Sequence, residues 1–251
     1  MVPPTVRHMP WKTGVDPVKW IPARSGLARA ASRAYLPKSL WHGVRERLAE
    51  EVPRIRVGDV ADFENFMGAV IDGASYRTQV EAIDEARTAG AEIVAGGDAD
   101  DSEGWFVRPT VVRTDDPHFR LLRDELFGPV LTTYVYDDAR WRETLRLIDE
   151  TSPYGLTGAV FARDRAAIVD AQNELVHAAG NFYVNDKPTG AVVGQQPFGG
   201  ARASGTNDKA GSMWNLIRWA SPRSIKETFV PPTDYRYPFM SPDGSAPADR
   251  P

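Results

Sequence analysis

The sequence predicts an α/β protein with a largely parallel sheet flanked by helices and with irregular ends. Short apolar runs alternate with stretches in which apolar residues recur at helical spacing. The length of 251 residues allows one large domain or two of ordinary size. Five prolines fall in residues 1–24 and six in residues 231–251, and proline fixes φ and removes a backbone donor. Both ends are therefore expected to lack regular structure.

Helices are expected where apolar residues recur three or four positions apart, which places them on one helical face. The expected helices are centred on the stripes at 41–48, 76–87, 141–148, 168–178 and 213–219. Ser39 is the expected N-cap of the first, and Gly90 and Gly180 are expected to end the second and the fourth.

Strands are expected in the short apolar runs between these helices. The runs cover residues 93–95, 106–112, 130–136, 156–162 and 182–185. Pro109 confines the second strand to a sheet edge or a bulge. Regular alternation of strand and helix is typical of βαβ units, which is why a largely parallel sheet is expected.

The complete absence of cysteine excludes several kinds of chemistry. Disulfides, zinc sites built on thiolates, Cys-ligated iron–sulfur clusters and thiolate nucleophiles all need this residue. The formal net charge of −4 and the pI near 5.6 argue against a nucleic-acid partner. Residues 1–8 contain no apolar region of a signal peptide, and no run approaches a membrane span. A cytoplasmic protein with no membrane partner is expected.

Metal and phosphate sites are not indicated by the sequence. The four histidines are scattered without metal-ligand spacing, so no metal site is expected. The chain contains no G-x-S-x-G nucleophile elbow, no G-x-G-x-x-G run and no Walker A lysine.

Two segments remain as candidates for binding. Residues 125–129 (Glu-Leu-Phe-Gly-Pro) directly precede the expected strand at 130. Their carboxylate and aromatic ring suit a sugar hydroxyl and a flat ring, although chemistry alone favours a helix end, a buried Phe and a turn. Residues 190–205 contain five glycines, which let a backbone approach a ligand closely and present N–H groups to an anion. A surface connection is the alternative for this loop.

These segments resemble the aldehyde dehydrogenase superfamily, and within it the L-glutamate γ-semialdehyde (1-pyrroline-5-carboxylate) dehydrogenase family. The runs that carry the resemblance are 32–35 (SRAY), 66–72 (FMGAVID), 154–161 (YGLTGAVF), 181–187 (NFYVNDK), 194–208 (GQQPFGGARASGTND) and 225–228 (IKET). The resemblance covers about residues 28–240 and implies the catalytic-domain half of the aldehyde dehydrogenase fold. It also implies oxidation of glutamate semialdehyde to glutamate with NAD, in proline degradation, through a cysteine thiohemiacetal.

The resemblance assigns roles by position. Glu125 corresponds to the residue that holds the hydroxyls of the nicotinamide ribose, and Phe127 to the aromatic residue beside the nicotinamide. Gly190 and Ala191 correspond to the loop whose N–H groups hold the substrate carboxylate. Phe198 corresponds to one wall of the aromatic box around the aldehyde chain.

The departures from the family are at the start of the chain. Aligned back from residues 32–35, the position of the nucleophilic cysteine falls at Ala28, and that of a carboxylate-binding serine falls at Arg29. The Rossmann-type cofactor domain, the general-base glutamate and the oxyanion-hole asparagine have no counterpart in this sequence. No catalytic residue of the family is thus retained, and the chain alone is expected to be inactive with weak substrate and NAD binding.

The expected organisation has four parts. Residues 1–27 form an unmatched Pro-rich leader, 28–205 the catalytic-domain region, 206–240 a C-terminal helix and oligomerisation strand, and 241–251 a disordered tail. Three interpretations stay open: a member of the dehydrogenase family, a non-catalytic remnant of a truncated or frameshifted gene, and an interaction module that forms homo-oligomers through the strand at 225–228.

Overall fold

The computed structural model describes residues 19–23, 31–186, 188, 195–231 and 235–240, with the backbone alone described for 19–23. The chain divides into two units, Met1–Asn215 and Leu216–Pro251. Among the described helices, none combines the length and the apolar character that crossing a bilayer requires. The expected disordered tail, 241–251, lies outside the described residues.

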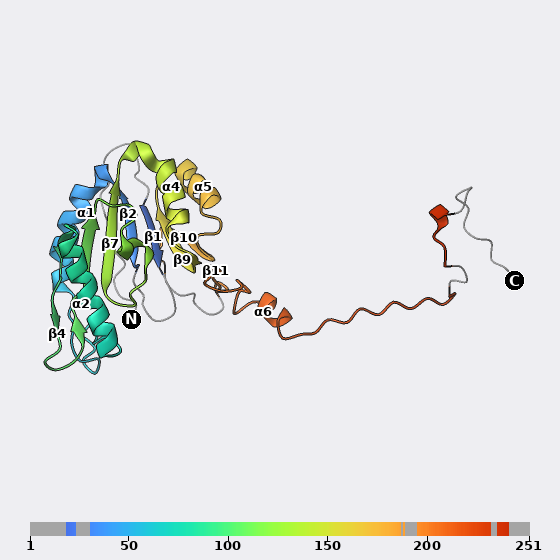
Figure 1. Ribbon diagram of the computed structural model, residues 1–251, viewed down its shortest axis with the longest axis horizontal. Coiled ribbons are helices and arrows are strands. Elements are labelled where there is room, and N and C mark those ends of the chain that lie inside the picture. Colours follow the sequence, from blue (N-terminus) through green and yellow to red (C-terminus); the bar gives the residue numbers. More distant parts are fainter. Residues whose placement is uncertain (1–18, 24–30, 187, 189–194, 232–234, 241–251) are drawn as a thin grey trace. The chain divides into compact units, whose positions relative to one another are not determined.

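The first unit is built on a seven-stranded sheet with the order β10-β9-β1-β2-β7-β6-β3 (Figure 1). Its strands are β1 (Lys19–Ala23), β2 (Arg33–Pro37), β3 (Glu92–Ala95), β6 (Thr110–Thr114), β7 (Val130–Tyr136), β9 (Thr157–Phe161) and β10 (Asn181–Val184). Two small ribbons pair β4 (Ala99–Asp100) with β5 (Phe106–Val107), and β8 (Tyr154–Gly155) with β11 (Ala201–Arg202).

The α/β class is confirmed, and the sheet is mixed. β2, β7 and β6 pair in parallel, as do β9 and β10. β3 pairs antiparallel with β6, and β1 pairs antiparallel with both β2 and β9. The sheet is less parallel than expected mainly because β1 contributes two of its antiparallel pairs.

The expectation that the Pro-rich leader lacks regular structure is wrong for part of it. Its residues Lys19–Ala23 form a strand in the interior of the sheet, where an irregular segment was expected. Pro22 lies within this strand, in register with Gly158 of β9. A proline-containing run of five residues has no periodic signal, so tertiary pairing and not local propensity places it in the sheet.

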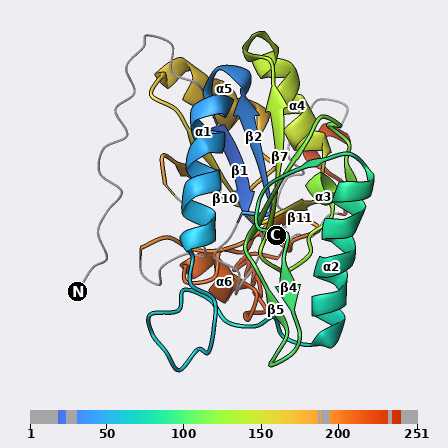
Figure 2. The same cartoon turned by 90° about the vertical axis from the view of Figure 1, so that its left-hand side faces the viewer.

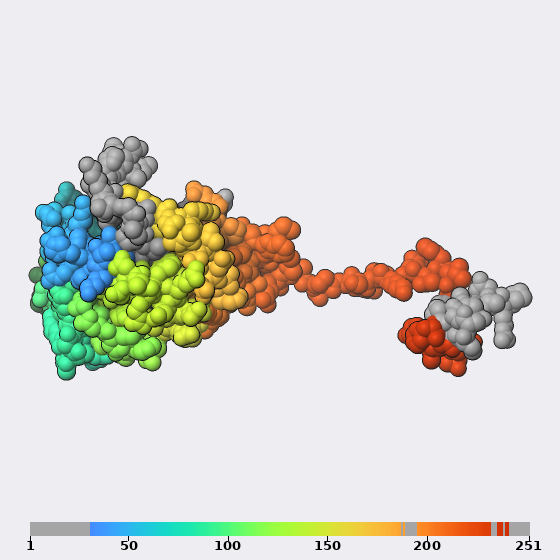
Figure 3. Space-filling view, turned by 90° about the horizontal axis from the view of Figure 1, so that it is seen from above, coloured from blue at the N-terminus to red at the C-terminus, as the bar shows by residue number. Residues whose placement is uncertain are grey.

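Helices cover the sheet largely where the stripes predict them. They are α1 (Lys38–Glu51), α2 (Gly73–Thr88), α3 (Arg120–Arg123), α4 (Trp141–Glu150), α5 (Arg165–Glu174) and α6 (Met213–Ile217), with short 3-10 turns at Val52–Arg54, Asp138–Arg140 and Pro238–Met240. Figure 1 shows α4 and α5 together beside β9 and β10, and Figures 1 and 2 show α2 beside β4, at the other end of the unit, where it contacts β3 and β5. On the surface in Figure 3, the yellow-green residues around α4 lie between α1 and α2 on one side and the yellow residues of α5 on the other.

Two helix boundaries differ from the expectation. The N-cap of α1 is Pro37, and Ser39 lies inside the helix. The Ser39 backbone N–H donates to the Asp138 carboxylate at 3.0 Å, and its hydroxyl contacts the same group, so a tertiary contact replaces the cap. α5 ends at Glu174, well before Gly180.

Pro109 divides the strand that was expected over 106–112. The chain pairs as β5 before the proline and as β6 after it. Because the missing N–H falls between the two strands, β6 occupies an interior position between β7 and β3. Pro109 therefore breaks the run without confining β6 to an edge, and the pairing of β6 with β3 shifts register between Ile93 and Ala95.

Two apolar clusters meet on one face of β7. One joins α4 and α5 to β2 and β9 and includes Tyr35, Leu145 and Val160. The other joins α2 and α3 to β6 and β7. Tyr134 packs against both clusters, and strand alternation places it on the same face as Val130 and Tyr136. The core is thus continuous across the sheet.

The second unit contains the 3-10 turn Pro238–Met240, in which the rings of Tyr237 and Phe239 stack at 5.7 Å. The segment Ile225–Thr228, expected as an oligomerisation strand, belongs to no strand among the described residues. The chain by itself therefore offers this segment no strand partner in its described part.

We predict that Asn185 stabilises the end of β10 through both its side chain and its backbone. Its side-chain amide donates to the Ala162 carbonyl at 2.8 Å and accepts from the Ala162 N–H at 2.9 Å, while its φ is +55°. Asn185→Gly should cost about 1–2 kcal/mol for the lost bonds, and Asn185→Ala about 1–2 kcal/mol more for the left-handed backbone. Urea unfolding of both variants measures the two costs separately. Equal midpoints for the two variants would exclude the backbone contribution.

Candidate functional site

The turn at residues 124–129 connects α3 to β7 and presents Phe127 to the surface. Phe127 has a φ of +54°, which is rare for an aromatic residue, and its side chain is 64% exposed. A bulky apolar side chain held outward in a strained conformation is typical of a functional position rather than of a packing one.

The buried side chain of Gln79 in α2 holds this turn. Its Nε2 donates to the Leu126 carbonyl at 2.6 Å, and the residue is 0% exposed. A Cβ on Gly128 would lie 2.2 Å from the Gln79 side chain, so only glycine fits beneath it. The turn and the helix are therefore locked together, and Phe127 is directed away from the core.

The end of the glycine-rich segment packs beside this turn. β11 pairs with β8, and the Gly155 N–H donates to the Ser204 hydroxyl at 3.0 Å. Arg202 forms an ion pair with Asp149 and donates to the Ser152 carbonyl at 3.2 Å. These contacts fix residues 201–204 against the start of β9 and the end of α4.

The two segments enclose a pocket of about 490 Å³. It is lined by Arg123, Asp124, Glu125, Phe127, Pro153, Tyr154, Leu156, Ala203 and Ser204. Phe127 and Tyr154 offer exposed aromatic rings, and Glu125 offers a half-buried carboxylate. A flat ring with nearby hydroxyl groups suits such a site, since aromatic faces stack and a carboxylate accepts from a diol.

Phe198 lies outside this pocket lining, in a separate clamp. Its backbone exchanges two hydrogen bonds with Ala210, at 2.9 and 2.7 Å. Asn181 donates to the Pro197 carbonyl and accepts from the Gly199 N–H, both at 3.0 Å. Lys209 donates to the Gly180 carbonyl, and burial lowers the pKa of its amine. Phe198 is therefore held firmly, half-buried, on its own loop.

The other residues that the sequence predicts for the site lie outside the described residues. Ala28 and Arg29 lie in 24–30, and Gly190 and Ala191 lie in 189–194, all outside the described residues. Of the expected site, the structure brings Glu125 and Phe127 together and shows Phe198 on a different loop. Among the described residues, no group of three or more acidic or histidine side chains could hold a metal ion.

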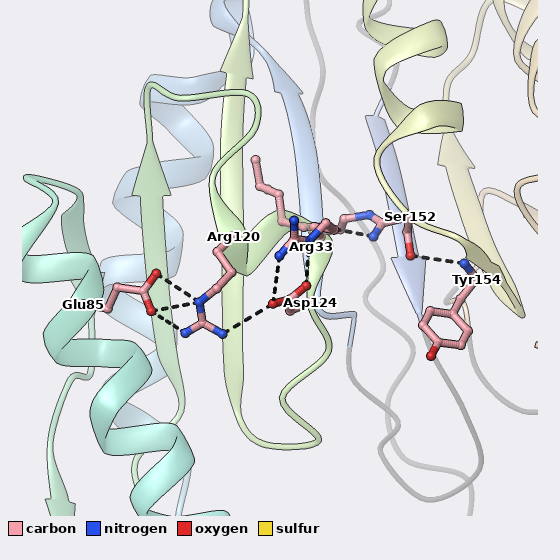
Figure 4. A network of polar contacts seen from close by, with 8 residues as sticks. Arg33, Glu85, Arg120, Asp124, Ser152 and Tyr154 are labelled. Carbon is pink, nitrogen blue, oxygen red and sulfur yellow. Dashed lines mark hydrogen bonds and ion pairs between the residues drawn. The ribbon is translucent and has the colours of Figure 1, made fainter. Parts of the chain in front are cut away.

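A chain of ion pairs supports the floor of the pocket (Figure 4). Arg120 lies between Glu85 of α2 and Asp124, and its Nε donates to both Glu85 oxygens at 2.9–3.0 Å. The hydrogen bond from Arg120 lowers the pKa of Glu85, and that from Arg123 lowers the pKa of Asp124. Both carboxylates are therefore held ionised, which keeps α3 in place ahead of the turn.

The sequence analysis did not name the residue that anchors the turn, Gln79, or two residues that line the pocket, Tyr154 and Ser204. Gln79 carries a recognisable signal, because it is a polar residue beside the apolar stripe of the helix at 76–87. Tyr154 and Ser204 lie in runs that carry the family resemblance, but the sequence does not place them beside Phe127, since the pairing of β8 with β11 does so.

Comparison with known proteins places this geometry in a family. The sequence model described as "Aldehyde dehydrogenase family" matches residues 27–225, which is most of the chain. The chain belongs to the aldehyde dehydrogenase family. The expected fold is confirmed with it, since solved members of the family superpose on this structure.

Several of the similar aldehyde dehydrogenases are named pyrroline-5-carboxylate dehydrogenases, and a betaine aldehyde dehydrogenase of Staphylococcus aureus is 31% identical. The chain is 55% identical over 212 residues to the mitochondrial delta-1-pyrroline-5-carboxylate dehydrogenase of Dictyostelium discoideum, covering 84% of this chain and 38% of that protein. The Mycobacterium tuberculosis enzyme of the same name, solved with NAD, is 52% identical with a TM-score of 0.71, over 84% of this chain and 38% of that one. The Thermus enzyme with bound NAD is 37% identical with a TM-score of 0.68, over 75% and 35%. The chain thus spans about two fifths of the length of these relatives.

We predict that Gln79→Ala loosens the turn that presents Phe127. The change removes a buried hydrogen bond and leaves a void against Gly128, and it should lower the free energy of unfolding by about 1–3 kcal/mol. Thr78→Ala, at an exposed position of the same helix, is the matched control and should change it by less than about 0.5 kcal/mol. Denaturant titration compares the two, and similar losses in both variants would contradict the role of Gln79.

We predict an acid-dependent contribution from the Glu85–Arg120 pair. The pKa of folded Glu85 lies below its ordinary value of 4.5, so the pair stabilises the fold above that pH and its contribution disappears as the pH falls through the lowered pKa. Glu85→Gln should therefore lose stability at pH 7, by at most about 1 kcal/mol since both side chains are partly exposed, and should lose less at pH 3. Glu81→Gln, on the exposed side of α2, is the control. A loss for Glu85→Gln that is the same at both pH values would refute the ion-pair contribution.

Proposed function

We propose that this chain carries the C-terminal catalytic-domain region of an NAD-dependent dehydrogenase of L-glutamate γ-semialdehyde, which interconverts with 1-pyrroline-5-carboxylate, in proline degradation. The observation that carries the proposal is the pocket in which Glu125 and Phe127 meet residues 203–204, in a chain 52–55% identical to enzymes of that name. By itself the chain does not catalyse this oxidation.

The pocket fits the nicotinamide end of NAD. The exposed ring of Phe127 provides a face for the nicotinamide, and the Glu125 carboxylate accepts from the ribose hydroxyls. Bound NAD supplies the hydride acceptor of the oxidation. The sequence has no glycine-rich phosphate cradle for the adenosine end, so we expect this chain to hold only the nicotinamide half, and weakly.

The substrate side of the proposal rests on the resemblance and on the clamp around Phe198. A firmly held aromatic wall suits the aliphatic chain of the aldehyde. The backbone N–H groups of Gly190 and Ala191 are proposed to hold the carboxylate. Arg29, where the family has a serine, weakens that contact.

The inactivity of the chain follows from its composition. Covalent attack on the aldehyde carbon in this family needs a thiolate, and none of the 251 residues is a cysteine. The position aligned with the nucleophile is Ala28, which has no lone pair to donate. Loss of a covalent nucleophile typically costs several orders of magnitude in rate.

Two further proposals concern assembly and location. We propose that copies associate through Ile225–Thr228, a segment in which the Ile225 side chain is 78% exposed and the described residues supply no strand partner. A non-catalytic interaction module is therefore the second candidate function. A cytoplasmic location stays a prediction, and several relatives are named mitochondrial.

The first experiment tests turnover. The purified chain receives glutamate semialdehyde and NAD, and NADH is followed by its absorbance, with a full-length pyrroline-5-carboxylate dehydrogenase assayed alongside. We expect no NADH above the blank from this chain. Sustained NADH formation by the chain alone would overturn the proposed inactivity.

The second experiment tests the nicotinamide site without requiring activity. Saturation-transfer NMR should show transfer from the protein to the nicotinamide protons of NAD, and Phe127→Ala should reduce it about tenfold, which corresponds to roughly 1.4 kcal/mol of binding. Phe63→Ala, at a residue 98% exposed and outside the pocket lining, is the matched control. Equal transfer in the two variants would contradict the assignment of Phe127.

A further inference from the structure

The seven-stranded sheet consists of two blocks that only one strand connects. β2, β7, β6 and β3 form the first block, and β9 and β10 form the second. β1 lies between them, paired with β9 at five successive residues and with β2 at Trp20↔Tyr35. Without β1, the facing edges of β2 and β9 would present unpaired backbone groups toward each other.

The connecting strand comes from outside the part of the chain that is shared with relatives. The family match covers residues 27–225, which includes both blocks and excludes Lys19–Ala23. The two sides of the gap are therefore family structure, whereas the strand that fills it belongs to the leader.

The filling strand is poorly matched to an interior position. Pro22 lies within it and cannot donate to either neighbour, although interior strands normally donate from every residue. Within the described residues, the pairing with β2 is registered at Trp20↔Tyr35 alone. The backbone pairing with β9 and β2 therefore holds this strand in the sheet more than its own β-propensity does.

The gap itself is lined by well-buried strands. Tyr35 of β2 and Val160 of β9 are both 0% exposed and belong to one apolar cluster with α4 and α5. The helices thus hold the two blocks at a spacing that admits one strand, while the backbone groups at the facing edges supply the hydrogen bonds that recognise it.

We propose that the gap between β2 and β9 is a binding site for one extended peptide strand, and that this chain's own residues 19–23 occupy it as an exchangeable, antiparallel insert. Recognition is by backbone hydrogen bonds, as in strand addition at a sheet edge, so the ligand class is an extended peptide with unblocked N–H groups. This inference does not depend on the proposed dehydrogenase function.

Paired substitutions in the full chain test the proposal with opposite signs. Pro22→Val restores a backbone donor and should raise the melting temperature by about 3–8 °C, whereas Ile21→Pro removes one and should lower it by a similar amount. Pro231→Val, at an exposed position outside every strand among the described residues, is the control and should leave it unchanged. A melting temperature that neither strand variant changes would overturn the proposal.

Peptide addition then tests exchange directly. Full-length Ile21→Pro receives a synthetic peptide of residues 17–25 of the unsubstituted sequence, and a peptide N-methylated at 19, 21 and 23 serves as the control. The first peptide should bind saturably, recover at least half of the lost melting temperature and restore hydrogen-exchange protection at 157–161. No binding, or equal recovery with the methylated peptide, would overturn the proposal. The proposal would also be overturned if the melting temperature of the unsubstituted chain rose with protein concentration. That result would mean that the inserted strand comes from a second copy of the chain.

Discussion

The hydrogen bond from the buried Gln79 amide to the Leu126 carbonyl is the contact on which the candidate site depends. It joins α2 to the turn before β7, and Gly128 allows the two to approach closely enough. β7 begins directly after this turn and pairs in parallel with β2 and β6, so the turn has a fixed position relative to the sheet. Phe127 directly follows the anchored Leu126 carbonyl, and its φ of +54° and 64% exposure accompany this anchoring.

The second support of the site comes from the other end of the sheet. β8 and β11 bring residues 203–204 to the pocket, and Arg202 ties them to the end of α4. The pocket therefore forms only when both blocks of the sheet are correctly spaced. This dependence connects the interior strand β1, which joins the blocks, to the geometry of a site that it does not line.

Periodicity in the sequence was sufficient for most helices and strands of the first unit, because burial on one face imposes it. Local signals failed where a tertiary contact replaced a local one. Ser39 was expected to cap α1, but its polar groups contact Asp138, 99 residues away. Lys19–Ala23 were expected to be irregular, yet the gap between β2 and β9 holds them as a strand.

The same distinction applies to the site. Glu125 and Phe127 were proposed because they adjoin a strand start and match a family motif. The structure places both on one pocket, and their binding roles stay a prediction. Tyr154 and Ser204 lie in segments that the sequence marks, but their proximity to Phe127 could not be predicted, since it depends on the register of a two-residue ribbon. The central claim is that the chain keeps a nicotinamide-binding pocket while lacking the thiol that would use it.

Titration of the ¹⁵N-labelled chain with nicotinamide mononucleotide tests that claim most directly, because this ligand is the half of NAD that the pocket fits. We expect chemical-shift changes concentrated at residues 123–128, 154–156 and 203–204, with α5 unaffected. Saturating additions that leave these residues unshifted, or that shift α5 equally, would contradict it.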